Sequence, residues 1–333
     1  MKSMDLRTNY MGLALRSPIV VSACPLSEDL DNILKMEDYG AGAVVLFSLF
    51  EEQIRQEHAH YDAVLAATSN MFAEAADFFP ELEDYHVGSA QYLELIRRAK
   101  ERTEIPIIAS LNGMTNEGWI QYAAEMEAAG ADGLEMNVFW VPADTRLTGN
   151  EVETRYLDII QSVKTAVNIP VAFKLNPYFS GMAHFAGQAS KAGADALVLF
   201  NRFYQPDFDI RKLQVLHNLR FSDAAEIRLP LLWIAVLYQR IGASLAATTG
   251  VQSAVEVIKY LLAGADVTMT ASALYKYGIG YLKNMHNDLQ EWMLEMGFTS
   301  VDAFKGVMSQ QNISDPVAYE RANYIRILEN AKP

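Results

Sequence analysis

Short apolar runs recur along the chain, and they begin in two alternating ways. In the first way a proline precedes the run, as in Pro18-Ile-Val-Val-Ser22 and Pro106-Ile-Ile-Ala-Ser110. In the second way Ala-Gly-Ala precedes it, as in Ala192-Gly-Ala-Asp-Ala-Leu-Val-Leu199. The glycine suits a position just past a helix, where φ is positive, and the run after it suits a strand buried on both faces. The alternation predicts parallel strands joined by helices.

The two kinds of run form four pairs, whose members lie about 25 residues apart. Each interval fits one strand, one helix and two short loops. Four such units give eight strands, which predicts a single (β/α)8 TIM barrel. A doubly wound open sheet has a similar local pattern, but eight near-periodic units with right-handed crossovers close naturally, which favours the barrel. Helical patterns cover Asp31–Tyr39, Glu117–Ala129, Tyr178–Ala192 and Ser253–Ala263.

Longer spacers interrupt this pattern after predicted strands 2, 4 and 6. We expect these insertions on the face where barrels bind substrates, because each follows a strand. The insertion after strand 6 contains residues 207–213, which suggest a small β-element. We expect one domain over residues 1–333, with the barrel core at about 13–298 and a C-terminal helical appendage at 299–333 whose last helix runs from Pro316 to Glu329. The insertions span residues 49–104, 139–169 and 202–242.

Composition narrows the class of protein. The chain has 333 residues, of which 51% are hydrophobic, and a net charge of −14. An acidic surface repels phosphate backbones, so we expect no nucleic-acid partner. The single cysteine, Cys24, allows no internal disulfide and no cysteine-based zinc site, and we expect no metal. The start of the chain lacks a signal-peptide core, and the apolar run Leu229–Tyr238 is too short to span a bilayer, so we expect a cytoplasmic protein without a membrane contact.

Polar residues close the otherwise apolar strands, and in a barrel they converge on one rim. Any one of them could satisfy backbone groups, but eight together favour a ligand site. Two of these strand ends suggest a phosphate, because small residues there precede helices whose first N–H groups are free to bind an anion. Ordinary helix caps are the alternative interpretation. The strand-end residues include Ser22, Ala23, Ser48, Asn112, Asn137, Lys174, Asn201, Thr248, Thr249, Gly250, Ala271 and Ser272.

Lys174 stands at the end of a strongly apolar strand. A lysine buried there needs an anion or an acceptor close by. Asn137 and Asn201 end the flanking strands and could hydrogen-bond a flat heterocycle. A surface salt bridge is the alternative for Lys174, which its apolar neighbours in Val171-Ala-Phe and Leu175-Asn-Pro disfavour.

These motifs, in this order, resemble the dihydroorotate dehydrogenase family, whose members are FMN-dependent barrels. The resemblance covers nearly the whole chain. It is carried by Leu13…Ser17-Pro18-Ile-Val, Glu135-Met-Asn137, Phe173-Lys174-Leu-Asn-Pro-Tyr-Phe179, Ala247-Thr-Thr-Gly-Val251, Ala263-Gly-Ala-Asp266, Thr270-Ala-Ser-Ala-Leu274 and Gly297-Phe-Thr-Ser-Val-Asp-Ala-Phe-Lys-Gly306.

The resemblance implies roles in binding FMN. Ser22 and Ala23 would contact the isoalloxazine ring, and Asn137 and Lys174 would contact its pyrimidine edge. Lys174 would favour the reduced flavin by placing positive charge where negative charge develops. The phosphate would be held by Thr249, Gly250, Ala271 and Ser272, and Ser48 and Asn201 complete the cofactor-binding set.

Two departures from the family pattern concern the chemistry. The cysteine or serine that removes a substrate proton in the family is replaced by Trp140, which cannot accept a proton, and a lysine at the end of strand 2 is replaced by Phe47. We expect Phe47, Phe139 and Trp140 to make the site flat and apolar. Another group must then accept or donate the proton. We predict two catalytic residues, Lys174 and Tyr204, and Tyr204 is the candidate for this proton transfer. Tyr178 and Cys24 are further candidates.

The resemblance therefore implies an FMN-dependent oxidoreductase of CH–CH donors, with hydride transfer between flavin N5 and a small, dihydropyrimidine-like substrate of pyrimidine metabolism. Two alternatives stay open, namely a flavin-binding or electron-transfer partner protein, and a flavin-free phosphate-binding barrel. We expect a homodimer, with a redox partner protein as a further option.

Overall fold

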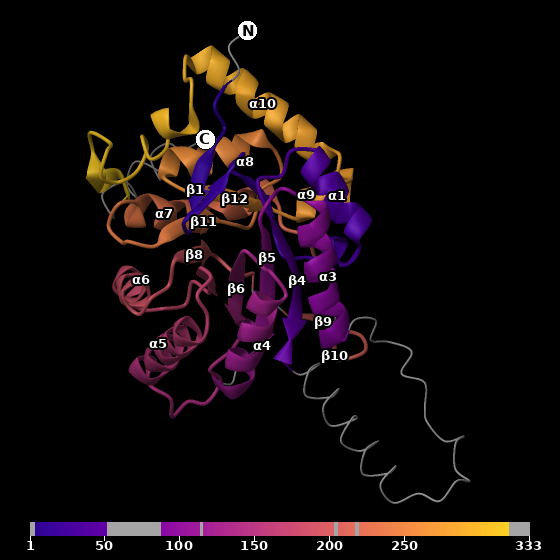
Figure 1. Cartoon of the computed structure of the whole chain (residues 1–333). Coiled ribbons are helices and arrows are strands. Elements are labelled where there is room, and N and C mark those ends of the chain that lie inside the picture. The colour runs from indigo at the N-terminus through magenta and orange to yellow at the C-terminus, as the bar shows by residue number, and fades with distance from the viewer. Residues whose placement is uncertain (1–3, 52–87, 114–115, 203–205, 217–219, 320–333) are drawn as a thin grey trace, which may run out of the picture.

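The computed structural model describes residues 4–51, 88–113, 116–202, 206–216 and 220–319 of the chain. Eight parallel strands close into a barrel in the order β11-β12-β3-β4-β5-β6-β7-β8, which confirms the predicted fold. Figure 1 shows the strands in the middle of the molecule with helices around them. The barrel strands are β3 (Ile19–Val21), β4 (Val44–Phe50), β5 (Ile107–Gly113), β6 (Gly133–Val138), β7 (Val171–Leu175), β8 (Ala196–Leu199), β11 (Ser244–Ala247) and β12 (Val267–Thr270).

The helices follow the predicted pattern to within a few residues, because apolar side chains at helical spacing face the barrel. The four expected helices are α1, α4, α6 and α8. Among the described residues, no helix is both long and apolar enough to cross a membrane. The α-helices are α1 (Leu30–Asp38), α3 (Ser89–Arg102), α4 (Asn116–Ala128), α5 (Gly149–Ala166), α6 (Met182–Lys191), α7 (Arg228–Leu237), α8 (Ala254–Ala263), α9 (Ser272–Tyr277) and α10 (Tyr281–Met296), and the 3-10 turns are η1 (Pro25–Glu28), η2 (Ala224–Ile227), η3 (Val301–Ala303) and η4 (Pro316–Tyr319).

Two antiparallel hairpins lie outside the barrel. The first, β1 (Thr8–Tyr10) with β2 (Leu13–Leu15), closes the amino end, since Tyr10, Met11 and Leu15 pack against inward-facing residues of the strands. The second, β9 (Asp207–Asp209) with β10 (Gln214–Leu216), is the small β-element expected after the sixth barrel strand. The last helix expected between Pro316 and Glu329 begins as η4, and the rest of it lies outside the described residues.

The same aspartate contact occurs three times at the amino end of the barrel. The aspartate of an Ala-Gly-Ala-Asp motif accepts a hydrogen bond from the backbone N–H at the start of the preceding barrel strand, and it also pairs with a lysine. Asp132 accepts from Ile107 N at 2.7 Å, Asp195 from Val171 N at 2.8 Å and Asp266 from Leu245 N at 2.8 Å. Their lysine partners are Lys100, Lys164 and Lys305 respectively. These pairs hold strand starts in register.

Candidate functional site

Polar side chains replace apolar ones in the half of the barrel interior that is closer to the carboxyl ends of the strands. Ser48 of β4 and Ser110 of β5 face each other with their hydroxyl oxygens 2.8 Å apart. On β6, Glu135 is 1% exposed and Asn137 is 8% exposed. Buried polar groups must be paired, so a layer of this kind marks a site rather than a packing core.

A β-bulge decides which side chain β4 presents to this layer. Val45 pairs with Ile108, but the next pair joins Ser48 to Ser110, so β4 carries one residue more than β5 between them. The extra residue turns Phe47 outward, where its ring meets Tyr92 of α3 edge-on at 4.9 Å. The inward group at this strand end is therefore Ser48. The expectation that Phe47 lines the site is wrong, because a bulge shifts the alternation of faces along a strand.

Lys174 and Glu135 form an ion pair inside the barrel. The Lys174 Nζ lies 3.2 Å from Glu135 Oε1, and the two side chains are 10% and 1% exposed. The surface salt bridge considered for Lys174 is thereby excluded. Beside this pair, the Asn201 amide donates to Asn137 Oδ1 at 2.7 Å, so the two asparagines that end the flanking strands contact each other.

A cavity of about 370 Å³ opens above this layer at the carboxyl ends of the strands. Its size falls within the range of small-molecule sites. Of the ten residues predicted to bind the cofactor, eight line it: Ser22, Ala23, Lys174, Asn201, Thr249, Gly250, Ala271 and Ser272. Ser48 and Asn137, the other two, lie in the polar layer described above.

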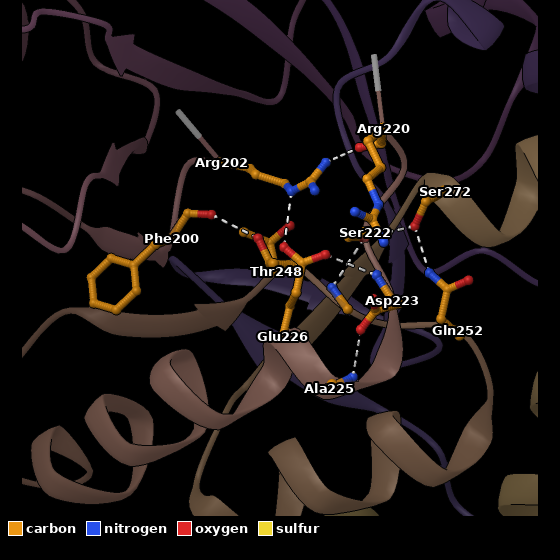
Figure 2. A network of polar contacts seen from close by, with 12 residues as sticks. Phe200, Arg202, Arg220, Ser222, Asp223, Ala225, Glu226, Thr248, Gln252 and Ser272 are labelled. Carbon is orange, nitrogen blue, oxygen red and sulfur yellow. Dashed lines mark hydrogen bonds and ion pairs between the residues drawn. The ribbon is translucent and has the colours of Figure 1, made fainter. Parts of the chain in front are cut away.

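Ser222 and Ser272 of the cavity lining belong, with Gln252, to a group of hydrogen-bonded side chains, the serine cluster (Ser222, Ser272 and Gln252). The Ser222 and Ser272 hydroxyls are 2.9 Å apart, and the Gln252 amide donates to Ser272 Oγ at 2.6 Å (Figure 2). The Gly250 N–H donates to Ser222 Oγ at 3.3 Å. Lys276 reaches the same cluster, since its Nζ donates to Gln252 Oε1 at 2.8 Å.

Gly250 has no room for a side chain. Its φ is +76°, and a Cβ would lie 2.7 Å from the Ile227 methyl group and 2.8 Å from the Asp223 carbonyl oxygen. The preceding Thr249 also has φ of +76°. Only glycine therefore fits at this position, where the backbone packs against η2 and lines the cavity.

Arg202 fastens the segment that carries Ser222. Its Nε donates to Glu226 Oε2 at 2.9 Å, and its guanidinium also donates to the Arg220 carbonyl oxygen (Figure 2). Asp223 and Glu226 form a capping box that starts η2. The sequence reasoning missed this segment, although Asp223-Ala-Ala-Glu226 is a recognisable capping-box pattern that could have located it.

Trp140 lies beside the site but does not line the cavity. Its ring is partly buried against the core, and the Arg155 guanidinium stacks over it at 4.4 Å from the ring centroid. The expectation that Phe47, Phe139 and Trp140 make the site flat and apolar is therefore wrong, because none of the three lines the cavity. The rings that do line the cavity are Phe200, Phe221 and Tyr275.

The proton-handling candidates differ in their surroundings. Burial raises the pKa of the Cys24 thiol to about 11, although Cys24 lines the cavity. Tyr178 is 68% exposed and lines a second, smaller hollow of about 200 Å³ beside the first. Tyr204 lies outside the described residues. Within the described ranges, no cluster of three or more histidine, cysteine, aspartate or glutamate side chains could hold a metal ion.

Comparison with known proteins agrees with this geometry. A sequence model of the dihydroorotate dehydrogenase family matches residues 85–293. A dihydroorotate dehydrogenase B (NAD(+)) catalytic subunit of Thermoplasma volcanium is 27% identical over 308 residues, covering 91% of this chain and 98% of that protein. The protein of the same description from Methanocaldococcus jannaschii is 24% identical over 300 residues, covering 88% of this chain and 95% of that protein.

The fold and the cavity define a (β/α)8 barrel with a cavity at the carboxyl ends of its strands. The chain belongs to the dihydroorotate dehydrogenase family, as the match over most of its length shows. Membership implies an FMN-dependent oxidoreductase that acts on CH–CH donors.

Proposed function

We propose that this chain is a single FMN-binding barrel that catalyses hydride transfer between a small, uncharged, dihydropyrimidine-like substrate and FMN. The observation that carries the proposal is that a buried lysine and the serine cluster line the same cavity. The first suits a ring that gains negative charge, and the second suits a phosphate. When bound, FMN supplies N5 as the hydride donor or acceptor.

The residues of the cavity fit FMN. Gly250, Ser222 and Ser272 would hold the phosphate with backbone and hydroxyl donors, together with Thr249 and Ala271, and Lys276 adds a positive charge nearby. Lys174 and Asn137 would bind the pyrimidine edge of the ring, with Ser22 and Ala23 against it.

The substrate proton is the step in which this chain departs from the family. Trp140 stands where the family has a cysteine or serine base, and an indole N–H cannot accept a proton. The Arg155 guanidinium over its ring keeps Trp140 in place. We therefore propose that dihydroorotate is a poor substrate and that Tyr204 handles the proton of a different compound.

The polar layer supports an uncharged substrate. Next to Lys174, the amide groups of Asn137 and Asn201 and the hydroxyl groups of Ser48 and Ser110 are available. Two cations, Arg202 and Arg220, also line the cavity, and the Arg202 guanidinium contacts Glu226 and the Arg220 carbonyl oxygen. Lys174 is already paired with Glu135. Hydroxyl and amide groups recognise carbonyl and N–H groups of a ring, whereas a carboxylate prefers an unpaired cation.

The relatives are named catalytic subunits, which suggests the electron partner. By analogy we propose a homodimer that exchanges electrons with a separate redox protein. Copurification and native mass measurement of the full chain would test both points, and a monomer that reacts directly with NAD(+) would contradict them.

The decisive experiment is the reduction of the purified protein by a panel of candidate donors. We expect bound FMN, seen in the visible spectrum, and bleaching by an uncharged dihydropyrimidine but not at a useful rate by dihydroorotate. Rapid bleaching by dihydroorotate would contradict the loss of the base. A flavin that no donor reduces would favour the electron-transfer alternative, and a protein that cannot be loaded with FMN would favour the flavin-free barrel.

The phosphate end has its own test, a comparison of FMN with riboflavin, which lacks the phosphate. We expect Ser222→Ala to weaken FMN binding by roughly 10- to 100-fold, because a hydrogen bond to a charged group contributes about 1.5–3 kcal/mol, and to leave riboflavin binding nearly unchanged. Ser309→Ala, a buried serine outside the cavity, is the matched control. Equal losses for both ligands would remove Ser222 from the phosphate site.

A further inference from the structure

The ion pair inside the barrel touches the cavity from one side only. Lys174 lines the cavity, whereas Glu135 lies among buried residues and is not part of the lining. The two strands are neighbours, and their register pairs Glu135 with Ala172 and Asn137 with Lys174. The ammonium group thus faces the cavity. The carboxylate lies closer to the amino end of the barrel, because Glu135 comes two residues before the register partner of Lys174.

The carboxylate has few partners in the described part of the chain. Its Oε1 accepts from Lys174, and its Oε2 is buried without a hydrogen-bond partner there. The Tyr10 hydroxyl of the amino-end hairpin is likewise buried and unpaired among the described residues, and burial, followed by the charge of Glu135, raises the pKa of this hydroxyl. Lys174 is therefore the group on which this carboxylate acts most directly.

We propose that Glu135 is a positioning residue for the flavin: it fixes the Lys174 ammonium at the cavity floor and offsets part of its positive charge at the pyrimidine edge of the ring. The inference rests on the proposed function, that is, on FMN in this cavity. A carboxylate behind the ammonium reduces the net field that the ring feels, and in a poorly solvated interior that reduction is large. Glu135 then limits how strongly Lys174 stabilises the reduced flavin.

The test is the redox behaviour of the flavin in the purified holoprotein. Glu135→Gln keeps the shape and a carbonyl acceptor for Lys174 but removes the negative charge. We expect the midpoint potential of the flavin to rise. We also expect sulfite, which binds flavins more tightly when positive charge lies near the pyrimidine edge, to bind about tenfold more tightly. Lys174→Met should shift both readouts in the opposite direction.

A matched control separates this effect from a general loss of a carboxylate. Glu37 accepts hydrogen bonds from Glu104 N and Ile105 N at the amino end of the barrel, far from the cavity lining. Glu37→Gln should leave the potential and the sulfite affinity unchanged. If Glu135→Gln does not fold, Glu135→Asp keeps the charge but withdraws it from Lys174, and we expect the same direction of shift at smaller size.

The possible outcomes distinguish the inference from the function on which it rests. A wild-type protein that cannot hold FMN contradicts the proposed function. A fully loaded Glu135→Gln protein whose potential and sulfite affinity equal those of the wild type, or move downward, overturns the role of Glu135 and leaves the FMN site intact.

Discussion

The two ends of this barrel are built from the same repeated unit but use it differently. At the amino end Asp132, Asp195 and Asp266 make one contact three times, each binding a strand start and a lysine. At the carboxyl end each strand finishes with a different polar group, such as Ser48, Asn137 or Lys174. The repetition favours stability, and the variation favours a site, as is usual for barrels of this kind.

The lysine partner of the third aspartate comes from a different part of the chain than the other two lysines. Lys100 and Lys164 come from the helix directly before the strand that their aspartate holds, whereas Lys305 comes from the segment after α10. The first unit, Ala41-Gly-Ala-Val44, has a valine in place of the aspartate, and there the Ser17 hydroxyl accepts from Ile19 N at 3.1 Å. The contact to the strand start is thus kept by different side chains, which indicates that the contact itself matters for the fold.

The largest predicted effect is a loss of stability caused by a change at the carboxyl end, where we expect the site. Lys174 belongs to the carboxyl end, yet Lys174→Met leaves the Glu135 carboxylate buried without its cation. We expect a loss of roughly 3–5 kcal/mol in the free energy of unfolding, measured by urea denaturation of the flavin-free protein. Lys276→Met is the control, because Lys276 is an exposed lysine at the same end. Equal losses for the two variants would show that the ion pair adds nothing to stability.

The next effect belongs to the amino end and depends on pH. Burial lowers the pKa of His286 to about 4, below its ordinary value of 6.5, and its Nε2 lies 3.3 Å from the Ser17 hydroxyl. Between pH 4 and pH 6.5, His286 is therefore protonated in the unfolded chain but neutral in the folded chain. Stability should fall as pH drops from about 6.5 toward 4, by up to roughly 3 kcal/mol.

The measurement for His286 is a series of urea denaturations across that pH range. His286→Gln should flatten the pH dependence. His184, which is exposed on α6, provides the matched control, and His184→Gln should keep the wild-type slope. The same slope in the wild type and His286→Gln would assign the pH dependence to other groups.

The repeated aspartates should each contribute somewhat less. Asp195→Ala removes the acceptor of the buried Val171 N–H, and an unsatisfied buried donor costs about 1–3 kcal/mol. FMN affinity should stay within about twofold, since the change is at the opposite end of the strands from the cavity. Asp144→Ala breaks an exposed pair with Arg146 and should change stability by less than about 0.5 kcal/mol. A large loss of FMN affinity in Asp195→Ala would contradict the view that the amino end contributes only to stability.

The same division explains what could be read from the sequence. The barrel and most of the cavity lining follow from periodic runs and from the residues that close them, because strand ends in a barrel must converge. The outward turn of Phe47 could not be foreseen, since a bulge depends on how β4 pairs with β5. Ser222 was missed because its segment is distant in the sequence from Gly250, and only the fold brings that segment to the cavity. Arg202 follows a predicted strand end, but its contact with Glu226 of that segment could not be foreseen.

The smallest predicted effect concerns Cys24, the thiol of the carboxyl end. Its pKa of about 11 means that only about one thiol in several thousand is ionised near pH 7.5, so it is poorly suited to accept a substrate proton. We expect iodoacetamide to label the native protein far more slowly than the urea-unfolded protein, with a rate that rises about tenfold per pH unit from 7 to 10. Fast labelling that levels off near pH 8 would instead identify an activated thiol, and Cys24 would then become the candidate for the base that Trp140 cannot be.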